Sequence, residues 1–91
     1  MYLEQLEELI ALLRKTDSLA SNWVQYFEKS KDLYLAGKVN DSYWHTLGSS
    51  GGMGSFDDDY WSYSLSKADQ ERHDYLKSNL RKLAKSNLNN K

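Results

Sequence analysis

Apolar side chains recur every three or four positions over three stretches of this chain, and polar side chains fill the positions between them. Such spacing places the apolar side chains on one face of a helix. The first stretch predicts an amphipathic helix that ends near Lys15, with glutamates in its early turns, where the positive end of the helix dipole favours them. Its apolar face consists of Leu3, Leu6, Leu9, Ile10 and Leu13.

The second stretch predicts a helix over residues 18–36. The side chains of Thr16, Asp17 and Ser18 are candidate caps for its first turn. Gly37 follows its last residue, at the position where a left-handed glycine commonly ends a helix. The predicted apolar face consists of Leu19, Trp23, Tyr26, Phe27 and either Leu33 or Tyr34.

A third, shorter helix follows, which Asn40 or Asp41 would cap and Gly48 would end. Its apolar face would consist of Tyr43, Trp44 and Leu47. Residues 59–61 favour a brief helical turn, and a short extended piece over residues 60–65 is the alternative.

The last helix is predicted to begin after Ser66, which stands three residues before Asp69 and can cap its first turn. Its predicted apolar stripe consists of Arg72, Tyr75, Leu76, Leu80, Leu83 and Ala84. His73 falls outside this stripe and is predicted to be solvated.

Short connections between successive helices favour antiparallel neighbours. The sequence therefore predicts an all-α fold: a small antiparallel bundle of three longer helices and one short helix, in a single domain over residues 1–91. A glycine-rich loop would join the short helix to the last helix. Ten of the twelve aromatic residues lie between Trp23 and Tyr63, more than so small a core can hold. We expect some of them, chiefly Tyr60, Trp61 and Tyr63, to be exposed, with packing over the end of the bundle as the alternative.

Composition narrows the class of protein further. The chain has no cysteine, which excludes disulfides and thiolate zinc sites. It shows neither a basic-then-apolar leader nor an apolar run of about eighteen residues, so we expect a cytoplasmic protein that does not span a membrane.

The net charge of −1 conceals an uneven distribution. Residues 1–64 carry ten acidic and five basic side chains, whereas residues 65–91 carry seven basic and three acidic ones. The basic tail is typical of a helix end whose cations complement the dipole. The alternative is two charged patches that serve two kinds of partner.

The stretch from Leu47 to Trp61 combines four glycines, three serines, three aspartates and three aromatics. It matches neither nucleotide-binding glycine fingerprint, and Asp57, Asp58 and Asp59 would repel a phosphate. The aspartates lack the alternating spacing of a calcium loop, so we expect no metal and no other cofactor. A serine–histidine–aspartate arrangement with His45 is conceivable, but no spacing enforces it, and we expect no catalytic residues. The last helix lacks a nucleic-acid-binding signature, so we expect no direct nucleic-acid partner.

The run from Gly51 to Asp58 resembles the loop motif GGMGSF(N/D)D of a family of small bacterial proteins. In that family a helix with a tryptophan precedes the motif, as Trp23 does here. The resemblance covers residues 9–58, and Gly51, Gly52, Gly54 and Ser55 would shape the loop. This chain has Asp57 in place of asparagine, and aromatic residues at 60 and 61 in place of aliphatic ones.

By analogy, small bacterial proteins of this kind resemble immunity proteins, which neutralise a toxin of the same bacterium. We therefore expect a protein-binding inhibitor with an acidic and aromatic surface for a basic partner such as a nuclease. The partner-binding residues would be Glu4, Glu7, Glu8, Asp57, Asp58, Asp59, Tyr60 and Trp61. The alternative is a ligand-binding or catalytic module that uses residues 51–55 and His45. The oligomeric state stays open.

Overall fold

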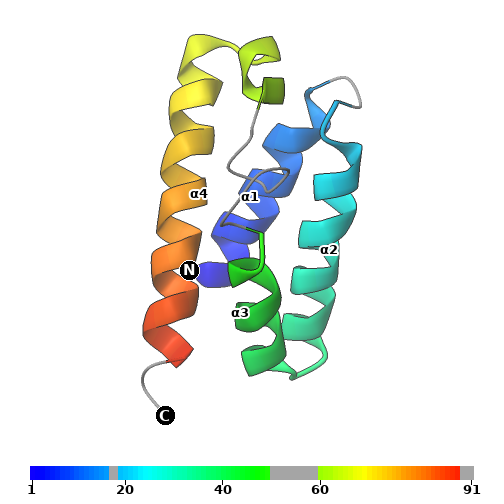
Figure 1. Cartoon of the computed structure of the whole chain (residues 1–91), viewed down its shortest axis with the longest axis vertical. Helices are drawn as coiled ribbons and strands as arrows, with labels where there is room; N and C mark the ends of the chain where they lie inside the picture. Colours follow the sequence, from blue (N-terminus) through cyan, green and yellow to red (C-terminus); the bar gives the residue numbers. More distant parts are fainter. Residues whose placement is uncertain (17–18, 50–59, 89–91) are drawn as a thin grey trace.

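The computed structural model describes residues 1–16, 19–49 and 60–88 of the chain (Figure 1). These residues form four α-helices and a short 3-10 helix, and none of them lies in a strand. The elements are α1 (Tyr2–Arg14), α2 (Ser21–Leu35), α3 (Val39–Leu47), the 3-10 helix η1 (Tyr60–Ser64) and α4 (Lys67–Leu88). The predicted all-α bundle of three longer helices and one short helix is confirmed.

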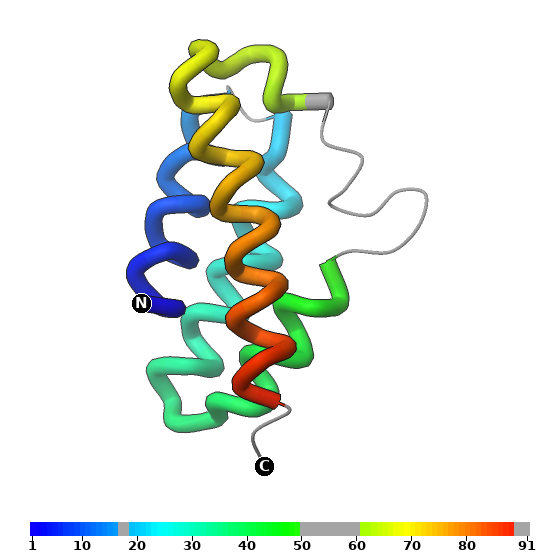
Figure 2. Tube along the Cα trace, turned by 90° about the vertical axis from the view of Figure 1, so that its left-hand side faces the viewer, coloured from blue at the N-terminus to red at the C-terminus, as the bar shows by residue number. Residues whose placement is uncertain are grey.

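Each helix runs antiparallel to the one before it, so that α1 and α3 point one way and α2 and α4 the other (Figures 1 and 2). Helix α2 packs against α1 and α3, and α4 packs against the same two helices. The backbones of α1 and α3 do not approach each other closely, so these two helices lie diagonally across the bundle and meet only through side chains such as Tyr2. Their solvent-facing sides consequently look in opposite directions.

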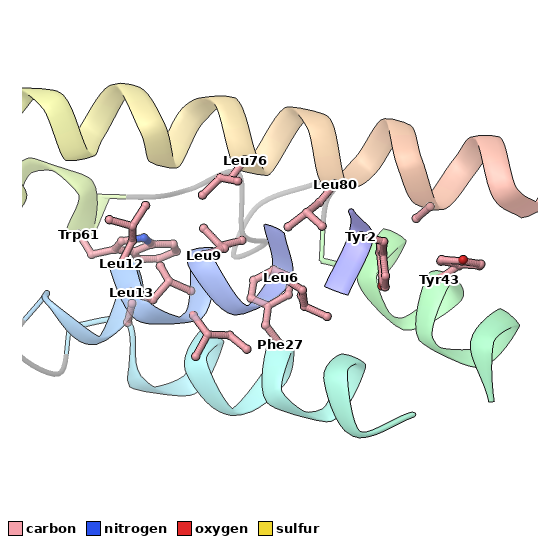
Figure 3. Packing of buried hydrophobic residues seen from close by; sticks show 13 residues of the cluster. Tyr2, Leu6, Leu9, Leu12, Leu13, Phe27, Tyr43, Trp61, Leu76 and Leu80 are labelled. Atoms are coloured by element: carbon pink, nitrogen blue, oxygen red, sulfur yellow. The ribbon is translucent and has the colours of Figure 1, made fainter. Parts of the chain in front are cut away.

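The core is built on α1, whose buried leucines face both of its neighbours (Figure 3). Leu6 and Leu9 are fully buried, as are Leu76 and Leu80 of α4, and Phe27 of α2 lies beside them. Trp61 closes one end of this cluster, beside Leu12 and Leu13. Complete burial of a leucine or phenylalanine side chain contributes about 1.5–3 kcal/mol.

Four buried hydroxyl groups join α1, α2 and α3 at the other end of the core. The Tyr2 hydroxyl lies 2.6 Å from Thr46 Oγ1 and 3.0 Å from Ser42 Oγ. Thr46 donates to Ser30 Oγ at 3.0 Å, and Ser42 donates to the Ser30 carbonyl at 2.6 Å. Every buried side-chain nitrogen and oxygen of the described residues has a partner, so these polar groups carry no unmet desolvation cost.

The helix ends follow the predictions in part. Gly37 has φ = 84°. The Lys38 N–H donates to Leu33 O at 2.9 Å and the Gly37 N–H donates to Tyr34 O at 3.1 Å, which together form a Schellman motif. The prediction that α2 begins at residue 18 is wrong: it begins at Ser21, and Thr16 donates to Leu13 O while it accepts from Ala20 N.

Two further predictions concern the starts of α3 and α4. The capping role of Asn40 or Asp41 is wrong, because α3 already begins at Val39 and Lys38 precedes it without a side-chain cap. The cap at Ser66 is confirmed, since its Oγ accepts from the Asp69 N–H at 3.2 Å. The segment before α4 is helical rather than extended.

Candidate functional site

The glutamates predicted to bind a partner lie on α1, and two of them pair with neighbouring helices. Glu7 lies 3.2 Å from Lys31 of α2. Glu8 accepts two hydrogen bonds from the Arg72 guanidinium of α4, at 2.5 and 2.8 Å, which hold the pKa of its carboxyl below its usual value. Glu4 stays exposed in the first turn. The side chains of Glu7 and Glu8 thus serve the packing of α1 as well as its surface charge.

The expectation that Trp61 lies on an exposed face is wrong, and the alternative that it packs over the end of the bundle is confirmed. Its side chain is only 2% exposed, because η1 turns it inward against the ends of α1 and α2. Tyr63, two residues further on, is 82% exposed, which confirms the expectation for that residue. Tyr60 begins η1. The other predicted residues, Gly51, Gly52, Gly54, Ser55, Asp57, Asp58 and Asp59, lie outside the described residues.

The described part of the first three helices is nearly neutral. Residues 1–16 and 19–49 carry six carboxylates and five cations. The acidic excess predicted for residues 1–64 therefore comes from Asp17 and Asp57–Asp59. An acidic surface for a basic partner depends on those aspartates and not on α1.

The largest exposed aromatic side chain is Trp44 of α3, which is 64% exposed. The prediction that it shares an apolar face with Tyr43 and Leu47 is wrong, because Trp44 is exposed whereas Tyr43 is buried and Leu47 is partly buried. Asn40, Asp41 and Gly48 are also exposed on α3 and lie within one turn of Trp44. We call these four residues, Asn40, Asp41, Trp44 and Gly48, the α3 face.

The α3 face and the glutamates of α1 do not form one surface. Helices α1 and α3 lie diagonally across the bundle, with α2 and α4 between them. The predicted contact residues Glu4, Glu7 and Glu8 are therefore on the opposite side of the bundle from Trp44.

His45 lies at the edge of the core, in contact with an aromatic cluster. Its ring stacks on Tyr26 with centroids 3.9 Å apart, and Trp23 meets Tyr26 edge-on at 5.1 Å. His45 Nε2 donates to Tyr26 O at 3.0 Å, and the Tyr26 hydroxyl donates to His45 O at 2.5 Å. Burial lowers the pKa of His45, Lys29 adds to that effect, and the bond to Tyr26 O opposes it.

The reciprocal bonds give His45 a positioning role between α2 and α3. Nε2 is occupied by a backbone carbonyl, so the imidazole joins the two helices. Gly48 lies beside this pair, because a Cβ there would meet the Tyr26 hydroxyl at 2.8 Å. The geometry around His45 explains the packing of α3 and the need for glycine at position 48.

His73 is fully buried, so the prediction that it is solvated is wrong. It lies on the buried stripe of α4 with Leu76, Leu80 and Ala84, at spacings of three and four residues. Tyr75 and Arg72, which the prediction put on that stripe, are exposed. The helical spacing from Leu76 back to residue 73 was the signal that could have identified its burial.

A small cavity and a wider groove are two of the hollows on the described surface. The cavity, of about 10 Å³, lies among Thr46, Ser49, Lys77 and Arg81 and has room for a single water. The groove, of about 500 Å³, runs along the outer side of α2 over Leu33 and Ala36. Among the described residues no three histidine, aspartate or glutamate side chains gather as metal ligands.

The described residues thus define a small four-helix bundle with an exposed tryptophan on its shortest α-helix. None of the described helices is both long enough and apolar enough to cross a membrane. Comparison with protein-family models, curated proteins and solved structures gives no match for this chain.

Proposed function

We propose that this chain is a protein-binding inhibitor that contacts its partner through the α3 face. The observation that carries the proposal is the exposure of Trp44, at 64%, on a helix whose other aromatic residue is buried. Tryptophan is strongly enriched among the residues that dominate binding energy at protein interfaces. Single exposed apolar side chains are common on protein surfaces, so the proposal also draws on the residues around Trp44.

Those neighbours give the α3 face an acidic and aromatic character. Asp41 lies one turn before Trp44, and both are exposed. Gly48 ends the helix on the same face, and the segment that follows it carries Asp57, Asp58 and Asp59. Carboxylates beside an aromatic side chain favour a basic partner, because complementary charge speeds association and rejects other proteins.

The class of inhibitor rests on the resemblance of residues 51–58 to a loop motif of small bacterial proteins. We propose an immunity protein that works in the cytoplasm and neutralises a cognate toxin, with a basic enzyme such as a nuclease as the target. In this proposal the chain itself is no enzyme and needs no cofactor, since binding alone blocks the toxin.

The test is capture of the partner by the immobilised chain from the cells that produce it, at low and at high salt, with mass spectrometry as the readout. We expect a stoichiometric basic protein that is released at high salt. Trp44→Ala should then weaken the complex at least tenfold, as truncation of a dominant interface residue does. Leu35→Ala is the matched control, because Leu35 is 61% exposed on α2 and should change the affinity little.

The role of the aspartates is tested separately. Asp57→Asn combined with Asp58→Asn should weaken binding and flatten its salt dependence without changing the helix content measured by circular dichroism. Unchanged affinity of both Trp44→Ala and the double aspartate variant would show that the contact lies elsewhere. Loss of binding in His45→Ala with unchanged stability would favour the alternative module built around His45.

A further inference from the structure

The two halves of α4 differ in charge. Residues 67–74 carry two cations and three carboxylates, whereas residues 75–88 carry four cations and no carboxylate. The four are Lys77, Arg81, Lys82 and Lys85. They span about 12 Å along the helix, at a rise of about 1.5 Å per residue. We call them the α4 basic strip.

The neighbouring helix α1 neutralises the first half of α4 and not the second. Asp69 lies 3.2 Å from Lys15, and Arg72 pairs with Glu8. Further along α4, the contact with α1 is a neutral hydrogen bond in which Asn79 Nδ2 donates to Gln5 Oε1 at 2.6 Å. No ion pair joins Lys82 or Lys85 to a carboxylate of the described residues.

The helix dipole accounts for one member of the strip only. Its effect falls off within the last turn, which contains Lys85 and neither Lys82 nor Arg81. The strip also contains the like-charged pairs Lys77–Arg81 and Arg81–Lys85, each four residues apart. Such pairs destabilise a helix by roughly 0.2–0.5 kcal/mol each. Lys77 and Arg81 have further interactions within the chain, so the charge that the strip offers a partner is chiefly that of Lys82 and Lys85.

We propose that the α4 basic strip binds an acidic segment of a partner protein. The positive charges of Lys82 and Lys85 complement the carboxylates of such a segment. Arg81 and Lys77 lie at the edge of this surface, beside the small cavity. Extended polyanions fit less well. A nucleic acid or an anionic membrane also meets the three carboxylates in the first half of α4 and a chain whose net charge is −1. A short acidic segment meets the strip alone, within a Debye length of about 8–10 Å.

This surface is separate from the α3 face and takes a partner of the opposite charge, so the two proposals can fail independently. The test measures fluorescence anisotropy of a labelled peptide of four glutamate and aspartate residues, which matches the length of the strip, against the full chain at low salt. A neutral peptide of the same length, a single-stranded oligonucleotide and vesicles with anionic lipid are the comparison probes. We expect the acidic peptide to bind most tightly, and the binding to vanish at high salt.

Lys82→Gln combined with Lys85→Gln should weaken peptide binding roughly fivefold, as the loss of two exposed ion pairs would. The matched control is Lys29→Gln combined with Lys38→Gln, which removes the same charge from exposed positions on α2 and before α3. Equal effects of the two double variants would overturn the proposal, because they would reflect net charge alone. Tighter binding of the oligonucleotide or the vesicles would also overturn it, in favour of a polyanion.

Discussion

The indole N–H of Trp61 donates a hydrogen bond to Nε2 of His73, at 3.4 Å, between two side chains that are both buried. An acceptor nitrogen must carry a lone pair, so the imidazole proton of the neutral ring lies on Nδ1. That nitrogen lies 3.1 Å from Asp74 Oδ1 and donates to it. The hydrogen bond between Trp61 and His73 attaches η1 to α4 at the end of the core that Trp61 closes.

The first prediction concerns this arrangement. Nitrogen-15 NMR of His73 should show the tautomer with the proton on Nδ1. Trp61→Phe removes the donor and should destabilise the fold by roughly 1–3 kcal/mol in urea unfolding, because a hydrogen bond between two buried side chains is lost. In a double-mutant cycle with His73→Leu, the two effects should not add. Additivity within about 0.5 kcal/mol would show that the two side chains are not coupled.

The second prediction is a pH dependence that originates at His45. Its pKa lies below the ordinary value of 6.5, chiefly because burial penalises the charged ring. In the unfolded chain the imidazole takes up its proton at the higher pH, so protonation favours unfolding. The free energy of unfolding should therefore fall as the pH drops from 6.5 to the pKa of His45 in the fold, and level off below it.

Urea unfolding across that pH range provides the measurement, with His45→Gln as the variant in which this dependence disappears. Lys29→Gln should raise the pKa of His45 in an NMR titration, because the Lys29 ammonium disfavours a second positive charge nearby. A profile that is equally steep with and without His45 would place the effect on another group. Glu8 contributes only at lower pH, where its own lowered pKa comes into play.

The third prediction tests the close approach of α3 to α2 at Gly48. In Gly48→Ala the new methyl group would lie 2.8 Å from the Tyr26 hydroxyl. That hydroxyl is held in place, because it donates a hydrogen bond to His45 O and the Tyr26 ring stacks on the His45 ring. We expect a loss of roughly 1–3 kcal/mol in stability, typical of an overpacked site. Tyr26→Phe removes the clashing oxygen, so Gly48→Ala should cost less in that background than in the natural chain. An equal cost in both would assign the effect to something other than this contact.

Much of this fold follows from periodicity alone. Apolar spacing predicted the bundle and the end of α1, and backbone sterics predicted the left-handed Gly37. Both act within a few residues, so they can be read from local sequence. The cap at Ser66 came from the same rules. The small size of the chain also predicted that some aromatic side chains are exposed, and Tyr63 is exposed as expected.

The burial or exposure of individual side chains could not be predicted from local sequence, because tertiary packing decides it. Trp61 and Trp44 have similar local sequence character, yet η1 turns Trp61 inward and α3 leaves Trp44 outside. His73 looked polar and solvated, but Trp61, twelve residues away, supplies the hydrogen bond that makes its burial possible. Pairings such as Glu8 with Arg72, across 64 residues, have no signature in the sequence.

The last prediction concerns the hydroxyl groups that join α1, α2 and α3. Thr46 donates to Ser30, so its oxygen is left to accept from the Tyr2 hydroxyl, at 2.6 Å. Thr46→Val keeps the shape and removes the hydroxyl, so Ser30 Oγ loses a buried donor, and the Tyr2 hydroxyl loses its nearest acceptor and is left with Ser42. We expect a loss of roughly 1–3 kcal/mol in the free energy of unfolding.

Two further variants separate hydrogen bonding from packing at this site. Thr46→Ser retains the hydroxyl and loses only a methyl group, so it should cost less than Thr46→Val. In Tyr2→Phe the second partner is absent as well, and Thr46→Val should cost less there than in the natural chain, since fewer polar groups remain unpaired. Equal costs for serine and valine at position 46 would show that packing dominates. Because Tyr2 of α1 reaches the diagonal helix α3, that result would also show that these hydrogen bonds contribute little to holding α1 and α3 together.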